Sequence, residues 1–143
     1  MSLPLIADTG GLLRALASGR DHKPLWPAFA NALTNASSVI VPVLILSEID
    51  YFLRDQRKAM RRLLADILDP STTYELAPLF PQDLVRACEI DAKFQELALG
   101  LVDSMVAAIA ERLRIYRILT IDQSDFLPLR VGPKFRQSLT IVP

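Results

Sequence analysis

The sequence predicts an α/β fold in three layers, with a central, mainly parallel sheet of four to five strands flanked by helices. Two observations predict it. Several short apolar runs are continuous rather than alternating, which is typical of strands buried on both faces, and they alternate along the chain with segments of helical periodicity. With 51% apolar and 22% charged residues, the 143-residue chain can form a compact core, and we expect a single domain over residues 1–143.

The first half of the chain is expected to hold two strands joined through helices. The run Leu3–Ala7 is apolar without interruption, and Gly10 and Gly11 mark the turn that follows it. Pro42 suits the first position of a helix, where its missing N–H is not needed. The elements expected up to Asp55 are a strand at Leu3–Ala7, helices at Leu12–Ala17 and Leu25–Asn35, a strand at Val39–Val41 and a helix from Pro42 to about Asp55.

In the second half, proline and glycine separate the expected elements. A helix ends before Pro70, because a residue that precedes proline disfavours the helical conformation, and Gly100 separates two strongly periodic helices. The elements expected here are helices at Gln56–Leu68, Pro81–Leu97 and Leu101–Leu113, strands at Thr72–Ala77 and Arg117–Ile121, and a short fifth strand at Leu139–Val142.

Charge and cysteine content exclude several classes of protein. The formal net charge is zero, so any nucleic-acid surface must be a local patch. The single cysteine, Cys88, rules out an internal disulfide, and we expect it to be a small core residue of a helix. We see no signal peptide, and the longest apolar run, Val39–Leu46, is too short to span a membrane. We therefore expect a cytoplasmic protein without a membrane partner.

Lone carboxylates in apolar surroundings are the most informative feature of the chain. Asp8 and Asp122 directly follow expected strands, Asp103 begins a helix, and Glu48 lies on an apolar helical face. Ligands bind beyond the carboxyl ends of parallel strands, so the four side chains can converge on one crevice. At an effective dielectric constant of 20, two such charges in contact repel by roughly 4 kcal/mol. Hard oxygen ligands suit Mg²⁺ or Mn²⁺, so the sequence predicts a metal-dependent nuclease.

Each acid also has an ordinary interpretation. Asp8 could cap a helix, Asp103 could be a plain acid in a first helical turn, and Asp122 could belong to a turn. Glu48 is the hardest to explain in this way, because its helical neighbours are apolar. We interpret the remaining acids as solvated side chains, with Asp50 paired to Arg54 four residues later. They are Asp21, Asp55, Asp66, Asp69, Asp83, Asp91, Glu75, Glu89, Glu96 and Glu111.

Basic residues gather in two segments. The first comprises Arg54, Arg57, Lys58, Arg61 and Arg62, and the second comprises Arg112, Arg114 and Arg117. Each segment is either a solvated surface or an edge that contacts phosphates. The lone His22 lies in a polar loop, and we expect it at the surface. No glycine-rich phosphate loop, Ser-His-Asp triad or Cys-His pair is evident.

Four short motifs, in order, resemble those of PIN domains. They are Ile6-Ala7-Asp8-Thr9 followed by Leu12-Leu13, Leu46-Ser47-Glu48-Ile49, Leu101-Val102-Asp103-Ser104, and Ile118-Leu119-Thr120-Ile121-Asp122 followed by Asp125-Phe126. The similarity extends across essentially the whole chain. The short form resembles the VapC toxins of bacterial toxin–antitoxin pairs.

The resemblance implies a Mg²⁺- or Mn²⁺-dependent endoribonuclease, usually a homodimer, that a small antitoxin inhibits. It implies Asp8, Glu48, Asp103 and Asp122 as catalytic and metal-binding acids, with Asp125 as a further ligand or as an acid behind the ligands. Thr120 is implied as a neighbouring polar residue, and we expect it to contact RNA together with Thr9, Arg57 and Lys58. Metal-activated water should leave a 5′-phosphate and a 3′-hydroxyl. The alternative is a non-catalytic RNA-binding or RNA-processing assembly module on the same fold.

Overall fold

A five-stranded parallel sheet organises the protein. The computed structural model describes residues 2–143. The strands of the sheet are β1 (Leu5–Ala7), β2 (Val39–Pro42), β3 (Tyr74–Ala77), β4 (Arg117–Leu119) and β7 (Thr140–Val142). Their order is β3-β2-β1-β4-β7, and every neighbouring pair is parallel. The predicted mainly parallel sheet is therefore confirmed, with five strands. The helix expected from Pro42 is wrong at its start, because Pro42 is the last residue of β2 and the helix begins at Ile45.

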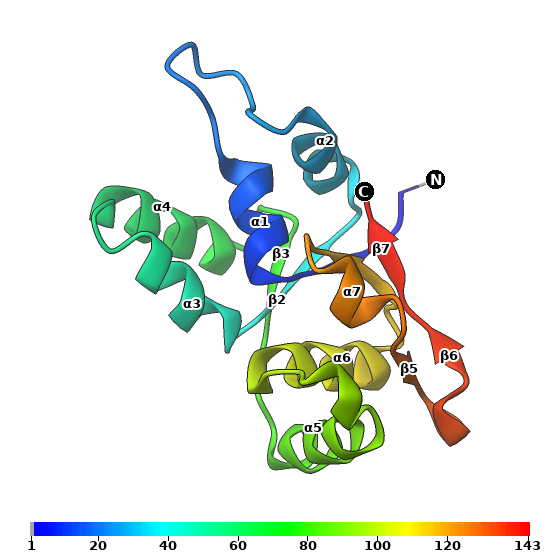
Figure 1. Ribbon diagram of the computed structural model, residues 1–143. Helices are drawn as coiled ribbons and strands as arrows, with labels where there is room; N and C mark the ends of the chain where they lie inside the picture. Colours follow the sequence, from blue (N-terminus) through cyan, green and yellow to red (C-terminus); the bar gives the residue numbers. More distant parts are fainter. Residues whose placement is uncertain (1) are drawn as a thin grey trace.

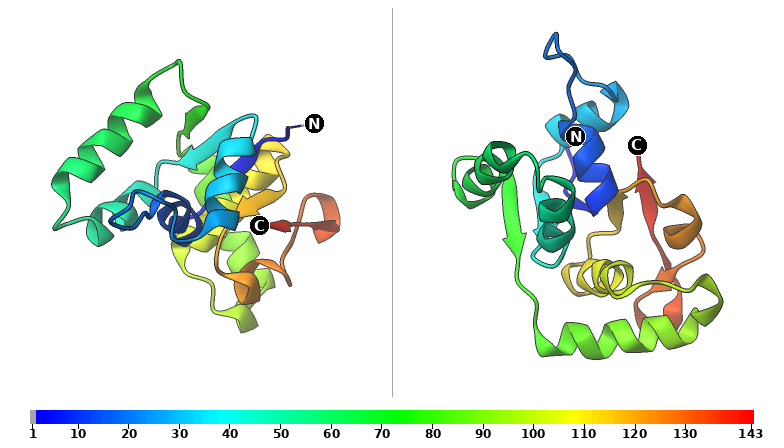
Figure 2. Two further views of the ribbon diagram at one scale, coloured as in Figure 1. Left: turned by 90° about the horizontal axis from the view of Figure 1, so that it is seen from above. Right: turned by 60° about the vertical axis from the view of Figure 1, so that its left-hand side comes forward.

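Helices cover both faces of this sheet and give the predicted three layers (Figures 1 and 2). On one face lie α1 and α2, and on the other lies α6 with α5 outside it, while α4 packs against β3 at the sheet edge. The helix bounds are α1 (Thr9–Leu16), α2 (Pro27–Asn35), α3 (Ile45–Phe52), α4 (Arg57–Leu68), α5 (Pro81–Lys93), α6 (Leu101–Leu113) and α7 (Gln123–Phe126). Within residues 2–143, no helix combines the length and apolarity needed to cross a membrane.

Burial explains why α6 has the bounds that the sequence predicts. Seven consecutive residues, 104–110, are buried, because the sheet lies on one side of the helix and α5 on the other. Small side chains such as Ala107 and Ala108 allow this close packing. As α6 cannot shift easily, the acid in its first turn, Asp103, has a well-defined place relative to the sheet.

Two predictions about the second half are wrong or incomplete. Cys88 is exposed rather than in the core, because α5 is the outermost helix and buries only the face with Asp83, Ala87 and Ile90. The sequence also did not predict α7, nor a hairpin of β5 (Arg130–Val131) and β6 (Gln137–Ser138) with a short 3-10 helix, η2 (Pro133–Phe135), between them. These elements are too short to produce a periodic pattern.

Candidate active site

The candidate active site lies between β1 and β4, where the order in which strands are added to the sheet reverses. The strands β2 and β3 continue from β1 on one side, whereas β7 continues from β4 on the other. Such a switch point leaves a crevice beyond the carboxyl ends of the two central strands. Asp8 follows β1 directly, and its backbone N–H donates to the carbonyl oxygen of Leu119 in β4 at 3.0 Å. The local chain path therefore brings the ends of both strands together.

Gly11 allows the helix after β1 to approach β4. A Cβ atom at this position would lie 2.1 Å from the carbonyl oxygen of Leu119 and 2.7 Å from the backbone nitrogen of Thr120. Neither backbone atom can move aside without disturbing the sheet. The glycine thus has a steric role that holds Asp8 close to the end of β4.

Asp8, Asp103 and Asp122 form the acidic cluster. One carboxylate oxygen from each lies within 4.8 Å of the other two, an arrangement that can hold a metal ion. Asp8 is buried at 3% exposure, and Asp122 is the least buried of the three. Within residues 2–143, no lysine or arginine forms a salt bridge to any of them. The structure therefore brings together three of the four predicted acids without a balancing cation.

Glu48, the fourth predicted acid, adjoins the acidic cluster through Thr9. It lies in the first turn of α3, and its Oε1 accepts a 2.5 Å hydrogen bond from the Thr9 hydroxyl. Its negative charge raises the pKa of both Asp8 and Asp122, although burial is the larger cause in each case. Glu48 is thus close enough to act on the cluster but does not belong to the group of three.

Thr120 connects two members of the acidic cluster. Its hydroxyl donates to Oδ2 of Asp8 at 2.9 Å and accepts the backbone N–H of Asp122 at 3.0 Å. Because Thr120 is buried, this bond orients the Asp8 carboxylate. Thr9 is similarly engaged, since its hydroxyl donates to Glu48, which makes it a positioning group in this structure.

Crowding and burial raise the pKa values of the clustered acids. Burial raises the pKa of Asp8 to about 6, against the lowering effect of the bond from Thr120. The pKa of Asp103 rises to about 8 because of burial, a hydrogen bond shared with the side chain of Asp125, and the charges of Asp8, Asp125 and Asp122. Asp125 therefore lies against Asp103. Without a cation, these acids are difficult to ionise together.

The predicted basic contacts lie outside the acidic cluster, on and just before α4. Arg54, Arg57, Lys58, Arg61 and Arg62 are all exposed. The ion pair predicted between Asp50 and Arg54 is wrong: Asp50 pairs with Arg57 at 2.6 Å, while the Arg54 guanidinium donates to the carbonyl oxygen of Tyr51 and lies 4.4 Å from the centre of its ring. Lys58 forms no salt bridge within the described chain. His22 is exposed, as predicted.

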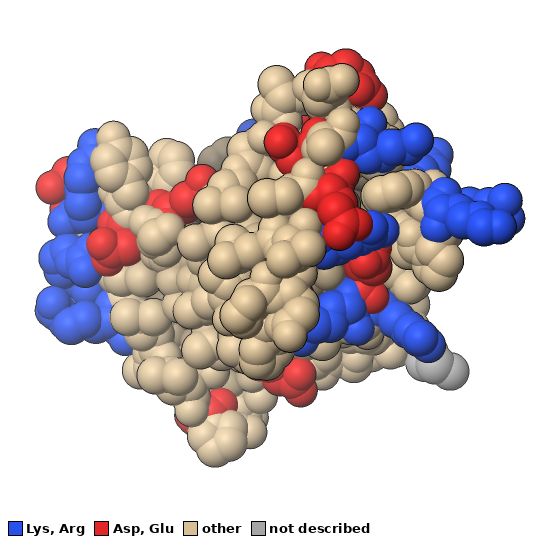
Figure 3. Space-filling model, turned by 90° about the horizontal axis from the view of Figure 1, so that it is seen from below, with Lys and Arg blue, Asp and Glu red and all other residues tan. Residues whose placement is uncertain are grey.

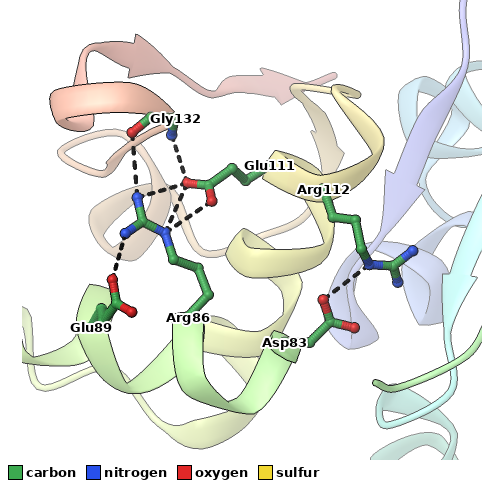
Figure 4. Close-up of polar contacts among 6 residues, drawn as sticks. All are labelled: Asp83, Arg86, Glu89, Glu111, Arg112 and Gly132. Atoms are coloured by element: carbon green, nitrogen blue, oxygen red, sulfur yellow. Dashed lines mark hydrogen bonds and ion pairs between the residues drawn. The ribbon is translucent and has the colours of Figure 1, made fainter. Parts of the chain in front are cut away.

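Two acids predicted to be solvated are structural instead. Asp83 is 3% exposed, accepts the backbone N–H of Phe80 at 3.0 Å and pairs with Arg112 at 2.9 Å. Glu111 pairs with Arg86 at 2.9 Å (Figure 4). The sequence could not reveal these pairs, because each arginine lies on the other helix of the α5–α6 pair, 25 or 29 residues away.

A groove between α1, α3 and α4 was also not predicted. It has a volume of about 760 Å³, and its walls include Leu12, Leu16, Trp26, Ile49, Phe52 and Leu63. Leu16, Trp26 and Phe52 are exposed. Exposed apolar side chains from α1, α3 and the residue before α2 thus face solvent together beside α4.

A family model and a curated relative both match this chain. The family model described as PIN domain matches residues 5–127. Ribonuclease VapC26 of Mycobacterium tuberculosis (strain ATCC 25618 / H37Rv) is 28% identical over 147 residues, which cover 97% of this chain and 100% of the relative.

Two solved structures resemble the fold. Mycobacterium tuberculosis VapC20, described as a sarcin-ricin loop cleaving toxin, has a TM-score of 0.65 and 18% identity, over 82% of this chain and 89% of the other. VapBC2 from Rickettsia felis, bound to a DNA fragment from its promoter, has a TM-score of 0.64 and 12% identity, over 99% and 100%.

Proposed function

Since the chain belongs to the PIN domain family, we propose that it is a metal-dependent endoribonuclease, the toxin of a VapBC-type toxin–antitoxin pair. The observation that carries this proposal is the acidic cluster at the switch point of the sheet. Its three carboxylates lie within 4.8 Å of one another, and none has a lysine or arginine partner in the described chain. The name of the relative, Ribonuclease VapC26, supports RNA as the substrate.

The donor set fits a divalent cation. Asp8, Asp103 and Asp122 offer three carboxylate oxygens from three chain segments, and such hard ligands suit Mg²⁺ or Mn²⁺. Burial and the neighbouring negative charges raise the pKa values of all three aspartates, so a bound cation would stabilise their ionised forms. In this proposal the three aspartates hold the ion, Asp125 orients Asp103, and Glu48 lies beside them to position the attacking water.

Hydrolysis of a phosphodiester requires attack of water on phosphorus and departure of the 3′ oxygen. An ion held by the three aspartates would neutralise charge at the phosphate and lower the pKa of the attacking water. Glu48 accepts a hydrogen bond from Thr9, which fixes one of its oxygens and leaves the other to accept a proton from water. Thr120 keeps Asp8 in one orientation. A water–phosphorus bond forms as the bond to the 3′ oxygen breaks, and that oxygen takes a proton, so the products carry a 5′-phosphate and a 3′-hydroxyl.

The antitoxin is proposed to bind in the groove between α1, α3 and α4. Apolar helices dock in grooves of this kind through side chains at helical spacing. Arg14 and Arg62 line the groove together with one acid, Asp66, so an amphipathic helix with acidic residues beside its apolar face would complement the two arginines. Copurification with the co-encoded small protein tests this, and Leu16→Glu with Phe52→Glu should abolish it. We also propose a homodimer, which light scattering of the purified chain tests.

Digestion of total RNA tests the activity directly. Wild-type protein in Mg²⁺ or Mn²⁺ should cut RNA to fragments with 5′-phosphates, and chelator should stop the reaction. Asp103→Asn should be inactive, whereas Asp91→Asn, the same change at an exposed acid of α5, should cut normally. Binding of RNA without any cleavage by the wild type would favour the non-catalytic module instead.

Calorimetry tests the metal separately from the activity. Mn²⁺ should bind the wild type and Asp91→Asn with similar heats, because Asp91 is outside the cluster. Asp8→Asn should bind more weakly, because a central carboxylate is lost. Equal heats for Asp8→Asn and the wild type would remove the metal site from the proposal.

A further inference from the structure

A second, smaller groove lies at the C-terminal end of α6, at the opposite end of the helix from Asp103. Its volume is about 390 Å³, and its walls come from α5, the end of α6, the segment before β4 and the turn between β5 and β6. Arg114, Tyr116 and Lys134 line it together with Arg86, Glu111 and Phe135. We name it the α6-end groove. From Asp103 to Arg114, the rise of the helix corresponds to about 16 Å.

A hydrogen-bonded network builds one wall of the α6-end groove (Figure 4). Arg86 donates to both carboxylate oxygens of Glu111 and pairs with Glu89, and its guanidinium lies 4.5 Å from the centre of the Phe135 ring. Glu111 also accepts the backbone N–H of Gly132 at 2.6 Å. The positive charge of Arg86 is therefore balanced, and the network gives the groove a rigid wall.

The remaining charge in the α6-end groove is positive. Arg114 and Lys134 are exposed, and neither forms a salt bridge with any of residues 2–143. Glu111 is the only acid that lines the groove among the described residues, and Arg86 already neutralises it. Tyr116 adds a phenol that makes no hydrogen bond in the described part of the chain. Two cations and a free hydroxyl donor thus face one cavity.

The backbone at both cations is in a conformation that favours glycine. Arg114 has φ 55° and ends α6, at a position where glycine is common, and Lys134 has φ 58° within η2. A left-handed conformation costs a non-glycine residue of order 1 kcal/mol or more, and such residues cluster at functional sites. Arg114 and Lys134 therefore lower the stability of the local backbone relative to glycine at these positions.

We propose that the α6-end groove binds a phosphate of the RNA substrate, at a distance from the bond that is cut. This rests on the proposed ribonuclease function. Phosphate oxygens accept hydrogen bonds from guanidinium, ammonium and hydroxyl groups, which are the free groups of this groove. Figure 3 shows Lys and Arg side chains at two opposite sides of one face, with Asp and Glu side chains among them and largely uncharged surface between the two sides. The groove would thus select RNA long enough to reach it from the acidic cluster.

Substitution of Arg114 and Lys134 by glycine separates the effect of their charge on RNA binding from their effect on stability. In Arg114→Gly with Lys134→Gly, the backbone strain is relieved, so the melting temperature should stay the same or rise. The affinity for a labelled single-stranded RNA, measured by fluorescence anisotropy in chelator, should fall about threefold to tenfold, and the slope of log affinity against log salt should fall by about one. Arg114→Gln with Lys134→Gln should show the same loss without the gain in stability.

The matched control removes two positive charges elsewhere. Arg20→Gln with Lys23→Gln changes two exposed cations of the loop between α1 and α2 and should bind RNA like the wild type. Equal weakening by this pair and the groove pair would overturn the proposal, because the effect would then be general electrostatics. Wild-type affinity in both groove variants would overturn it as well.

Cleavage distinguishes this proposal from the function on which it rests. With Mn²⁺, the groove variants should cut an RNA of a few nucleotides at the wild-type rate, while KM for a long RNA rises and kcat stays unchanged. If the wild type cuts RNA and the groove variants show no change in KM, only the groove is refuted. If the wild type neither binds nor cuts any RNA, the ribonuclease function fails and the groove assignment fails with it.

Discussion

Two regions of this protein each combine a buried aspartate with less buried carboxylates, and the negative charges are compensated in one region but not in the other. Between α5 and α6, Asp83 and Glu111 each meet an arginine at 2.9 Å, and both also accept a backbone N–H. We call these two pairs the α5–α6 clamps. In the acidic cluster, Asp8, Asp103 and Asp122 meet one another, and no lysine or arginine within the described chain compensates them.

The difference shows that burial of an acid does not by itself indicate function. A buried carboxylate with an arginine partner is a structural element, and removing either partner leaves an uncompensated charge. A group of buried carboxylates without a partner is unfavourable until a cation binds. The informative signal is therefore the missing counter-charge, and the following experiments test that distinction.

The largest expected effect is on cleavage. Asp103→Asn should reduce RNA cleavage by at least about 100-fold at saturating Mn²⁺, since even loss of a group that orients a metal ligand typically costs 10- to 100-fold. The fold should survive, and RNA binding should stay the same or tighten because a negative charge near the phosphate is lost. Asp83→Asn, the identical change in a clamp, should retain cleavage per folded molecule. A comparable loss of cleavage in both variants would contradict the assignment of a catalytic role to the acidic cluster and a structural role to the clamps.

Stability should respond in the reverse order. Asp83→Asn leaves the partly exposed Arg112 without its carboxylate and weakens the hydrogen bonds of a side chain that is 3% exposed, so the free energy of unfolding should fall by about 2 kcal/mol. Asp103→Asn in chelator should be neutral or stabilising, because it removes repulsion. Urea denaturation of the two variants and the wild type gives both values, and a clear loss of stability in Asp103→Asn would contradict the view that the cluster is unbalanced.

The acidic cluster should also make stability depend on pH. The pKa of Asp8 is raised to about 6 and that of Asp103 to about 8, so between pH 4 and 8 the folded state holds protons that the unfolded state releases. The associated stability is fully present below about pH 4 and is lost as the pH rises to about 8. At 1.36 kcal/mol per pKa unit, the two shifts correspond to at most about 5 kcal/mol between pH 5 and pH 8. Asp103 is partly exposed and solvent screens its charge, so in chelator the unfolding free energy should be lower at pH 8 than at pH 5 by about 2 kcal/mol.

Metal and mutation provide the controls for this pH dependence. Mn²⁺ should remove most of the loss at pH 8, because the ion compensates the ionised carboxylates. Asp8→Asn with Asp103→Asn should flatten the profile in chelator. The double variant Asp83→Asn with Glu111→Gln alters the clamps instead and should lower stability at both pH values. An unchanged slope in the cluster variant would show that these acids do not titrate together.

The sequence predicted the cluster better than the clamps for a physical reason. Asp8, Asp103 and Asp122 follow strands or begin a helix, and parallel topology brings those positions to one edge of the sheet. The partner of Asp83 is 29 residues away on another helix, so a rule that considers only neighbours in the same helix cannot find it. The same limit explains Asp50, which pairs with Arg57 on the next helix rather than with Arg54.

Exposure was the property that local patterns predicted least well. Cys88 lies on α5, whose inner face packs on α6. Its outer face is not covered by any of residues 2–143, and the sequence alone does not reveal this. The hairpin of β5 and β6 depends on Gly132, with φ 77°, and on contacts from Arg86 and Glu111. Tertiary contacts therefore determine such short elements, whereas α6 follows from its own continuous apolar sequence.

Ser104 provides the test with the smallest expected effect. Like the acids of the cluster, it is a polar residue without a compensating partner, but it carries no charge. It follows Asp103 on α6, is 2% exposed, and its hydroxyl is the one buried side-chain polar atom of residues 2–143 without a hydrogen-bond partner. An unpartnered buried hydroxyl is unfavourable, so Ser104→Ala should raise the free energy of unfolding by about 1 kcal/mol. The affinity for Mn²⁺ should not change, because the three carboxylates of the acidic cluster stay in place. Weaker Mn²⁺ binding by Ser104→Ala would instead show that an uncharged polar group on α6 contributes to the metal site. The missing counter-charge would then no longer distinguish this region.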